Sequence, residues 1–149
     1  MADVTATYAN RQFPLTAVVE FDYSTFTEDQ VDQVIALPAG AIITDVILQV
    51  KTAWNSTTPT FNVGLFSVTP ADPDDFLDGV SLGTGDSTFQ TSVRSADEEA
   101  ALDASDLNHI TNGDEIAVLY AAAGGTATAG AATLIVEYVV GGRSNENQG

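Results

Sequence analysis

Apolar and polar residues alternate with a period of two along most of this chain, and this pattern predicts β-strands. The longest such stretch runs from Ala36 to Trp54 (ALPAGAIITDVILQVKTAW), where a Pro-Ala-Gly turn precedes the alternating residues. Even-numbered positions from Ile42 onward form one face, and odd-numbered positions from Ile43 onward form the other. Such a strand has one covered face and one wetter face. We therefore expect a central strand whose even-numbered side chains build the core.

The same alternation predicts further strands on both sides of this stretch. They lie at Leu15 to Tyr23, Val31 to Leu37, Phe61 to Leu65, Ile116 to Tyr120 and Leu134 to Val140, with weaker ones at Gly79 to Leu82 and Ser87 to Val93. We expect the long strand to pair with Phe61 to Leu65 as an antiparallel hairpin, and the last two strands to form a closing hairpin. Gly64 leaves room for a large side chain, such as that of Trp54, to pack over it.

Three segments depart from the strand pattern. The segment Ala96 to Leu107 (ADEEAALDASDL) has helix-forming residues with acids early, which suit the positive end of a helix dipole and predict a short helix. Met1 to Pro14 is polar and irregular, and we expect an N-terminal arm. The folded domain then spans residues 15 to 140, and Gly141 to Gly149 (GGRSNENQG) is expected to be a mobile tail.

Many short strands with at most one short helix predict an all-β protein. An antiparallel β-sandwich of jelly-roll-like type is the two-sheet solution for such a chain. An immunoglobulin-like Greek-key sandwich is the alternative. The length of 149 residues suits a single domain. The absence of cysteine removes disulfides, thiol chemistry and cysteine-ligated zinc.

Charge limits the partners of this protein. The chain has 21 acidic and 4 basic residues, which give a formal net charge of −17. Such a surface repels phosphate backbones and anionic membranes, so neither nucleic acid nor a membrane is an expected partner. The first residues lack the basic start and apolar core of a signal peptide, and no apolar run approaches the ~20 residues of a membrane span. We expect synthesis in the cytoplasm and release by a route such as cell lysis.

Metal sites have two candidates in the sequence. The single histidine, His109, follows Asp103 and Asp106, which could bring two carboxylates near one imidazole, although a surface histidine near a turn is the commoner situation. The segment PADPDDFLD invites a calcium interpretation because hard cations take several oxygen ligands. Its acids are Asp72, Asp74, Asp75 and Asp78. The EF-hand spacing is absent, so a solvated acidic loop is the favoured interpretation and no cofactor is expected.

Catalytic and sugar-binding residues are no clearer. The serines have no nucleophile-elbow context, no phosphate-cradling loop occurs, and the abundance of acids makes any carboxylate pair uninformative. The sequence therefore predicts no enzyme. Four aromatic residues at strand spacing could stack on carbohydrate, although core packing is the default for such residues. They are Trp54, Phe61, Phe66 and Tyr120.

At the level of whole segments, the chain resembles the decoration, or cement, proteins of tailed bacteriophage heads. The resemblance lies in LPAGAIITDVILQVKTAW, in the following TFNVGLF, and in the segments NGDEIAVLY and AATLIVEYVV near the C-terminus. It implies a small jelly-roll-like domain that forms a homotrimer on the outer capsid surface and bridges adjacent copies of the major capsid protein. A phage virion is then the expected location.

Two sets of residues are the candidates for these contacts. The odd-numbered face of the long strand is our candidate inter-subunit surface, because it mixes apolar and polar side chains beyond the needs of one core. Its residues are Ile43, Asp45, Ile47, Gln49 and Lys51. The N-terminal arm is the candidate capsid-contacting segment, through Tyr8, Arg11 and Phe13. A carbohydrate- or receptor-binding β-module of a phage fibre or tail is the alternative function.

Overall fold

A computed structural model of the chain describes residues 13–68, 70–92, 109–110 and 113–141. Within these ranges the chain forms strands joined by turns and loops, and no helix long and apolar enough to cross a bilayer is found there. The strands are β1 (Leu15–Asp22), β2 (Val31–Leu37), β3 (Ala41–Thr52), β4 (Thr60–Leu65), β5 (Leu77–Ser81), β6 (Ser87–Ser92), β7 (His109–Ile110), β8 (Asp114–Ala121) and β9 (Ala131–Val140). The helix predicted at Ala96 to Leu107 lies outside the described residues.

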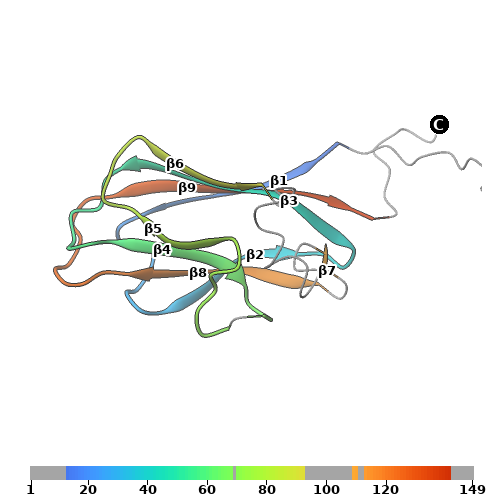
Figure 1. Ribbon diagram of the computed structural model, residues 1–149, viewed down its shortest axis with the longest axis horizontal. Coiled ribbons are helices and arrows are strands. Elements are labelled where there is room, and N and C mark those ends of the chain that lie inside the picture. Colours follow the sequence, from blue (N-terminus) through green and yellow to red (C-terminus); the bar gives the residue numbers. More distant parts are fainter. Residues whose placement is uncertain (1–12, 69, 93–108, 111–112, 142–149) are drawn as a thin grey trace, which may run out of the picture.

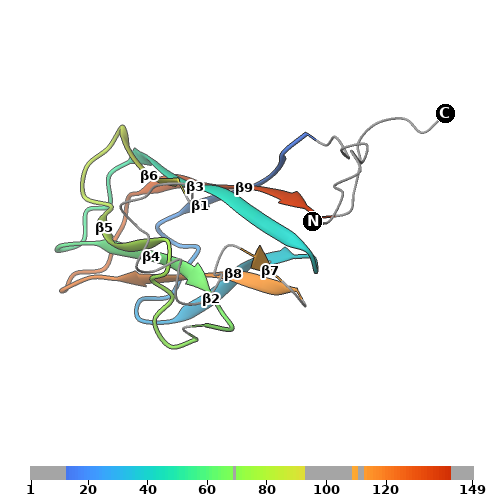
Figure 2. The same cartoon turned by 45° about the vertical axis from the view of Figure 1, so that its right-hand side comes forward.

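Two antiparallel sheets pack face to face (Figure 1). Sheet A has the strand order β1-β9-β3-β6, with the two-residue β7 also pairing with β3, and sheet B has the order β2-β8-β4-β5. Turning the molecule by 45° keeps the two layers distinct (Figure 2). The predicted all-β antiparallel sandwich is confirmed, and β3 is a central strand as expected.

Chain order within the sheets distinguishes the two sandwich types. If the short β7 is set aside, sheet A contains the first, eighth, third and sixth strands, and sheet B the second, seventh, fourth and fifth. Consecutive strands thus alternate between sheets nearly everywhere, β4 and β5 being the pair that stays within one sheet. This alternation is the jelly-roll pattern of two nested Greek keys. An immunoglobulin-like sandwich would keep more consecutive strands in one sheet.

Both predicted hairpins are wrong. The strand β3 lies in sheet A and β4 in sheet B, and β8 and β9 are divided between the sheets in the same way. The connecting segments 53–59 and 122–130 are longer than the about two to five residues of common hairpin loops. Each crosses the roughly 10 Å between the packed sheets instead of turning back within one. Neighbouring strands in sequence therefore face each other across the core.

The long strand β3 has two register shifts in its pairing with β9, and the first is a β-bulge that changes its facing direction. The pairing with β9 shifts between Ile43 and Asp45, so that Thr44 is the extra residue. The even-numbered Thr52 follows a second register shift and is exposed, contrary to the prediction. Between the two shifts Val46, Leu48 and Val50 are fully buried, as predicted. Before the first bulge the order is reversed, and Ile43 is only 1% exposed. The placement of Ile43 on the outer face was therefore wrong.

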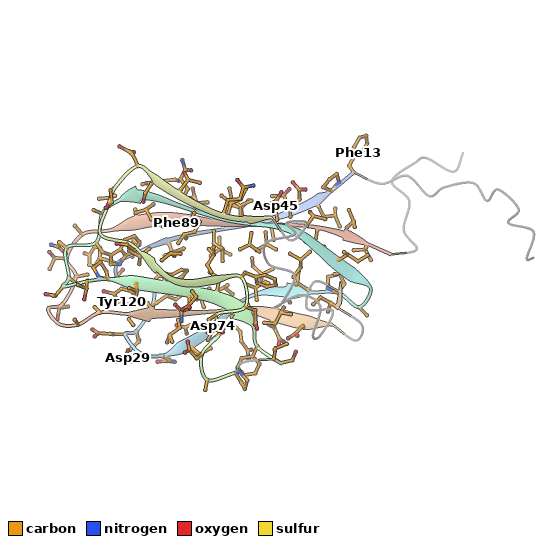
Figure 3. The ribbon with its side chains drawn as sticks, viewed as in Figure 1. Phe13, Asp29, Asp45, Asp74, Phe89 and Tyr120 are labelled. Carbon is orange, nitrogen blue, oxygen red and sulfur yellow. The ribbon has the colours of Figure 1, made fainter. Side chains whose placement is uncertain are left out.

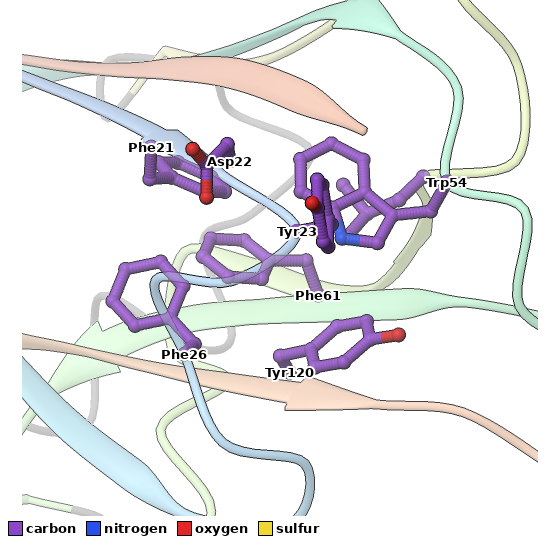
Figure 4. Close-up of a pocket in the computed structure, with 8 residues that line it drawn as sticks. Phe21, Asp22, Tyr23, Phe26, Trp54, Phe61 and Tyr120 are labelled. Atoms are coloured by element: carbon purple, nitrogen blue, oxygen red, sulfur yellow. The ribbon is translucent and has the colours of Figure 1, made fainter. Parts of the chain in front are cut away.

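Aromatic rings fill one end of the core between the sheets (Figure 4). The ring of Phe21 stacks on Phe61 with centroids 5.0 Å apart, and it also lies 4.9 Å from Phe26 and 5.9 Å from Trp54. Trp54 is 4% exposed and covers Gly130, where an added Cβ would lie 2.3 Å from the indole ring. Offset and tilted rings at these distances stabilise a core beyond the area that they bury.

Candidate interaction surface

Three branched apolar side chains cross the outer face of sheet A, and we call them the apolar row. Val18 on β1 is paired with Ile135 on β9, which is paired in turn with Ile47 on β3. Directly opposed residues of antiparallel strands project to the same side with Cβ atoms about 5 Å apart, so these side chains are neighbours. Val18 is 56% exposed, and the two isoleucines are half-buried. The row therefore presents apolar surface on the solvent side of the sheet.

A polar row lies beside it, two residues along the strands. Asp45 on β3 is paired with Glu137 on β9, so that two carboxylates lie opposite each other. The hydroxyl of Thr44, which projects at the bulge, donates to Glu137 Oε1 at 3.0 Å, and the amide of Gln90 donates to Asp45 Oδ1 at 3.2 Å. Within the described part of the chain no basic side chain pairs with either carboxylate.

An ion pair borders the other flank of the apolar row. Lys51 Nζ on β3 donates to Glu20 Oε1 on β1 at 2.9 Å, and the contact reaches across β9, which lies between these strands. The hydrogen bond from Lys51, reinforced by its positive charge, lowers the pKa of Glu20 below its ordinary value. Both side chains are largely exposed, and a pair of this kind contributes little to stability.

Thr133 lies in this flank, between Glu20 and Gln49 in the register of the sheet. Its side chain faces outward, but Thr133 is only 6% exposed because neighbouring side chains cover it. Its hydroxyl has no hydrogen-bond partner among the described residues. A buried hydroxyl without a partner destabilises the fold, since its hydrogen bonds to water are lost on folding.

The structure thus brings together most of the predicted inter-subunit surface. Asp45, Ile47, Gln49 and Lys51 share the outer face of sheet A, whereas Ile43 belongs to the core. Figure 3 marks Asp45 on this sheet. Val18 was not predicted to belong to this surface, although its position between Thr16 and Glu20 on the polar side of β1 was a usable signal.

Part of the outer face of sheet B, around Gly64, is covered by the chain itself. An added Cβ at Gly64 would lie 2.6 Å from Asp75 Oδ2, 2.7 Å from the carbonyl carbon of Pro73 and 2.9 Å from the backbone nitrogen of Asp74. The loop between β4 and β5 therefore lies directly on this glycine. The expectation that a large aromatic such as Trp54 covers Gly64 was wrong, because a folded-back backbone occupies the space.

Side chains anchor this loop. The carboxylate of Asp75 accepts a hydrogen bond from the backbone N–H of Leu65 at 2.8 Å. The amide of Asn62 donates to Asp72 Oδ1 at 2.7 Å, and its oxygen accepts from the N–H of Gly79 at 2.7 Å. Two acids of the loop thus serve as acceptors for the protein itself, and Asn62 joins both ends of the loop to β4.

The remaining loop acid, Asp74, is electrostatically unfavourable where it lies (Figure 3). Burial, followed by the negative charges of Asp72 and Asp78, raises the pKa of Asp74 above its ordinary value of 3.8. No group of three or more metal-ligating side chains occurs among residues 13–68, 70–92, 109–110 and 113–141. His109 lies in β7, but its proposed partners Asp103 and Asp106 are outside the described residues.

Both ends of the described chain leave from one end of sheet A. Leu15, at the start of β1, is paired with Tyr138, near the end of β9. Phe13 precedes β1, is 78% exposed, and projects beyond the sandwich (Figure 3). Of the predicted capsid-contacting residues, Tyr8 and Arg11 lie outside the described residues, as does the tail after Gly141.

The aromatic residues proposed for sugar stacking do not form a surface. Trp54, Phe61 and Tyr120 are buried in the core, and the ring cluster around them leaves no room for a water molecule. Tyr120 also shares a hydrogen bond with the hydroxyl of Ser56 at 2.8 Å. Phe66 is half-buried. The default of core packing is thus confirmed for the three buried rings.

Three solved structures share this fold along nearly the whole chain. A chain from the capsid asymmetric unit of cyanophage Pam1 matches with a TM-score of 0.61 and 18% identity, over 94% of this chain and 92% of that chain. A chain from the acid-stable capsid of Helicobacter pylori bacteriophage KHP30 matches at 0.57 and 19% identity, over 85% and 87%. A chain from the capsid of Ralstonia phage GP4 matches at 0.56 and 17% identity, over 94% and 91%.

Sequence comparison adds no relative. No protein-family model matches the chain, and no curated protein matches it. At this low identity, the likeness to the three capsid chains establishes a shared fold.

Proposed function

We propose that this chain is a structural protein of a bacteriophage capsid, and specifically a decoration or cement protein. It binds the outer surface of the head and stabilises contacts between copies of the major capsid protein. The observation that carries the proposal is the fold shared with chains from three phage capsids, each matched over 85% or more of this chain. The correspondence therefore concerns the whole domain.

The surface of the molecule supports a binding role without turnover. The apolar row gives sheet A a contact surface, and the net charge of −17 suits a protein on the outside of a particle that contains DNA. The proposed role needs no cofactor and no catalytic group. Many weak contacts repeated over a capsid lattice add up to stable attachment.

A homotrimer and a docking arm belong to the same proposal. Phe13 is exposed where the arm Met1 to Pro14 joins the sandwich, so the arm starts from a position open to neighbouring molecules. Through Tyr8, Arg11 and Phe13 it would add contact area with the major capsid protein. Light scattering of the capsid-free protein measures the oligomer, and a stable monomer at micromolar concentration contradicts the trimer.

Co-sedimentation tests the main proposal. Purified protein is mixed with undecorated capsids of the phage that encodes it, and we expect it to pellet with them and to raise the temperature at which they lose their contents. Removal of residues 1–14 is expected to lower capsid binding more than it lowers the melting temperature of the free protein. Failure of the full chain to pellet with capsids contradicts the proposed function.

The alternative of a carbohydrate-binding module receives no support from the aromatic residues. Three of the four rings are buried in the core and expose no aromatic face on which a sugar ring could stack. They are those of Trp54, Phe61 and Tyr120.

A further inference from the structure

We infer that the outer face of sheet A docks onto a basic surface of a different protein, and not onto a second copy of this chain. The inference rests on the proposed function and names the chemistry of the partner at the candidate surface. In the proposed setting that partner is the capsid shell.

The apolar row supplies the reason for docking. Val18, Ile135 and Ile47 form a strip across three adjacent strands and remain partly exposed to solvent. Burying such a strip against apolar atoms of a partner removes it from water, which is favourable. The strand β9 pairs with both β1 and β3, so the strip is already ordered in the free protein.

Carboxylates beside the strip determine what the partner carries. A partner seated on the apolar row also covers Asp45 and Glu137, which lie two residues along the same strands. Their present partners are neutral donors, the hydroxyl of Thr44 and the amide of Gln90. Covering two opposed carboxylates without a positive charge is costly, whereas Lys or Arg at these points compensates their lost hydration.

A second copy of this chain is a poor source of such charge. The chain has 4 basic residues against 21 acidic ones. Lys51 is the basic residue within the described part, and it already pairs with Glu20 on the same face. The other three, Arg11, Arg94 and Arg143, lie outside the described residues. Two copies brought face to face would add the carboxylates of the second copy to the contact, and the lysine that its described residues supply is already paired with Glu20.

The partner surface is therefore apolar with flanking Lys or Arg. Arginine fits best at the Asp45–Glu137 pair, since its planar guanidinium binds carboxylates through two donors and is weakly hydrated. A contact of this composition weakens as salt is added, because part of its energy is electrostatic.

Three variants of the full-length protein test the inference with undecorated capsids as the probe. D45K reverses one charge beside the apolar row, and V18T replaces an exposed methyl group by a hydroxyl in a strand-compatible side chain. E28K makes the same charge change in the exposed β1–β2 turn and is the control. We expect D45K to weaken capsid binding about tenfold or more, V18T to weaken it less, and E28K to leave it near wild type.

The outcomes separate the inference from the proposed function. If wild-type protein binds capsids and D45K and V18T bind equally well, the inference is overturned while the proposed function stands. If wild-type protein does not bind, both fail. Loss of oligomer mass in D45K without loss of capsid binding would assign the face to a second copy and overturn the inference. Melting curves show whether each variant is folded, and V18T remains informative if D45K is not.

Discussion

The outer faces of the two sheets differ in what covers them. On sheet B, Ala117 lies opposite Gly64, and the β4–β5 loop packs directly on the glycine. On sheet A, the central strands carry Ile135 and Ile47 at their outer surface, with Val18 alongside. Small residues on sheet B let the β4–β5 loop pack on the sheet at close range, whereas branched residues on sheet A leave apolar surface exposed.

Under the proposed function, one side of the domain is closed by its own loop and the other side serves assembly. The loop on sheet B is held by hydrogen bonds from Leu65 and Asn62, so its cover is part of the fold. Asp45 and Glu137 on sheet A have only neutral partners in the described structure. Substitutions on sheet B should therefore change stability, and substitutions on sheet A should change binding.

Gly64→Ala is expected to have the largest effect on stability. The new Cβ would meet two backbone atoms and a carboxylate oxygen within 3.0 Å, and backbone cannot yield as a flexible side chain does. We expect a loss of about 3 kcal/mol, at the upper end for overpacking, in the free energy of unfolding measured with urea. Gly83→Ala is the control, because its Cβ would make contacts of 3.5 Å or longer. Equal losses in the two variants would contradict a close cover on sheet B.

Asp75→Ala removes the acceptor of the backbone N–H of Leu65. Leu65 is only 2% exposed. Because the N–H of Leu65 would then be buried without a partner, we expect the free energy of unfolding to fall by about 2 kcal/mol, measured with urea. Asp75→Asn keeps an acceptor oxygen and should lose less. If alanine and asparagine destabilise equally, the hydrogen bond does not hold the loop.

Thr133→Val changes a covered position on the outer face of sheet A. The substitution keeps the shape of the side chain and removes the hydroxyl that lacks a partner. We expect the free energy of unfolding, measured by thermal or chemical denaturation, to rise by about 1 kcal/mol. Thr88→Val, at an exposed position of β6, should give no such gain. A loss of stability in T133V would show that the hydroxyl is hydrogen-bonded in solution.

Asp74→Asn should have the smallest effect, and its pH dependence identifies its cause. Because the pKa of Asp74 is raised in the folded state, its ionised form destabilises the fold at neutral pH, and this cost disappears as pH falls below its ordinary value of 3.8. We expect the free energy of unfolding to rise by at most about 0.5 kcal/mol at pH 7, and this gain to vanish in acid. Glu28→Gln corrects for the general effect of removing one negative charge. A gain independent of pH would contradict this explanation.

Much of the fold could be predicted from the sequence, because strand alternation is a local signal. The burial of Val46 and Leu48 follows from it directly. The reversal at Ile43 could not be predicted, since Ile-Ile-Thr-Asp fits either facing direction until the bulge at Thr44 is known. Strand partners were also hidden, because a jelly roll joins neighbours in sequence across the core and not within a sheet.

The candidate surface was predicted in part for the same reason. One strand displays its own outer face, so Asp45 and Ile47 were found from alternation. The apolar row needs three strands in register, and Val18 and Ile135 join it only through pairings distant in sequence. The cover on Gly64 depends on a loop folding back, which no periodicity records.

Electron cryo-microscopy of capsids incubated with the protein would show which face of the sandwich contacts the shell. We expect sandwich density on the outer surface of the head, with sheet A toward the shell and basic shell residues beside Asp45 and Glu137. Density with sheet B toward the shell, or sheet A packed against another copy of this chain, would contradict this expectation.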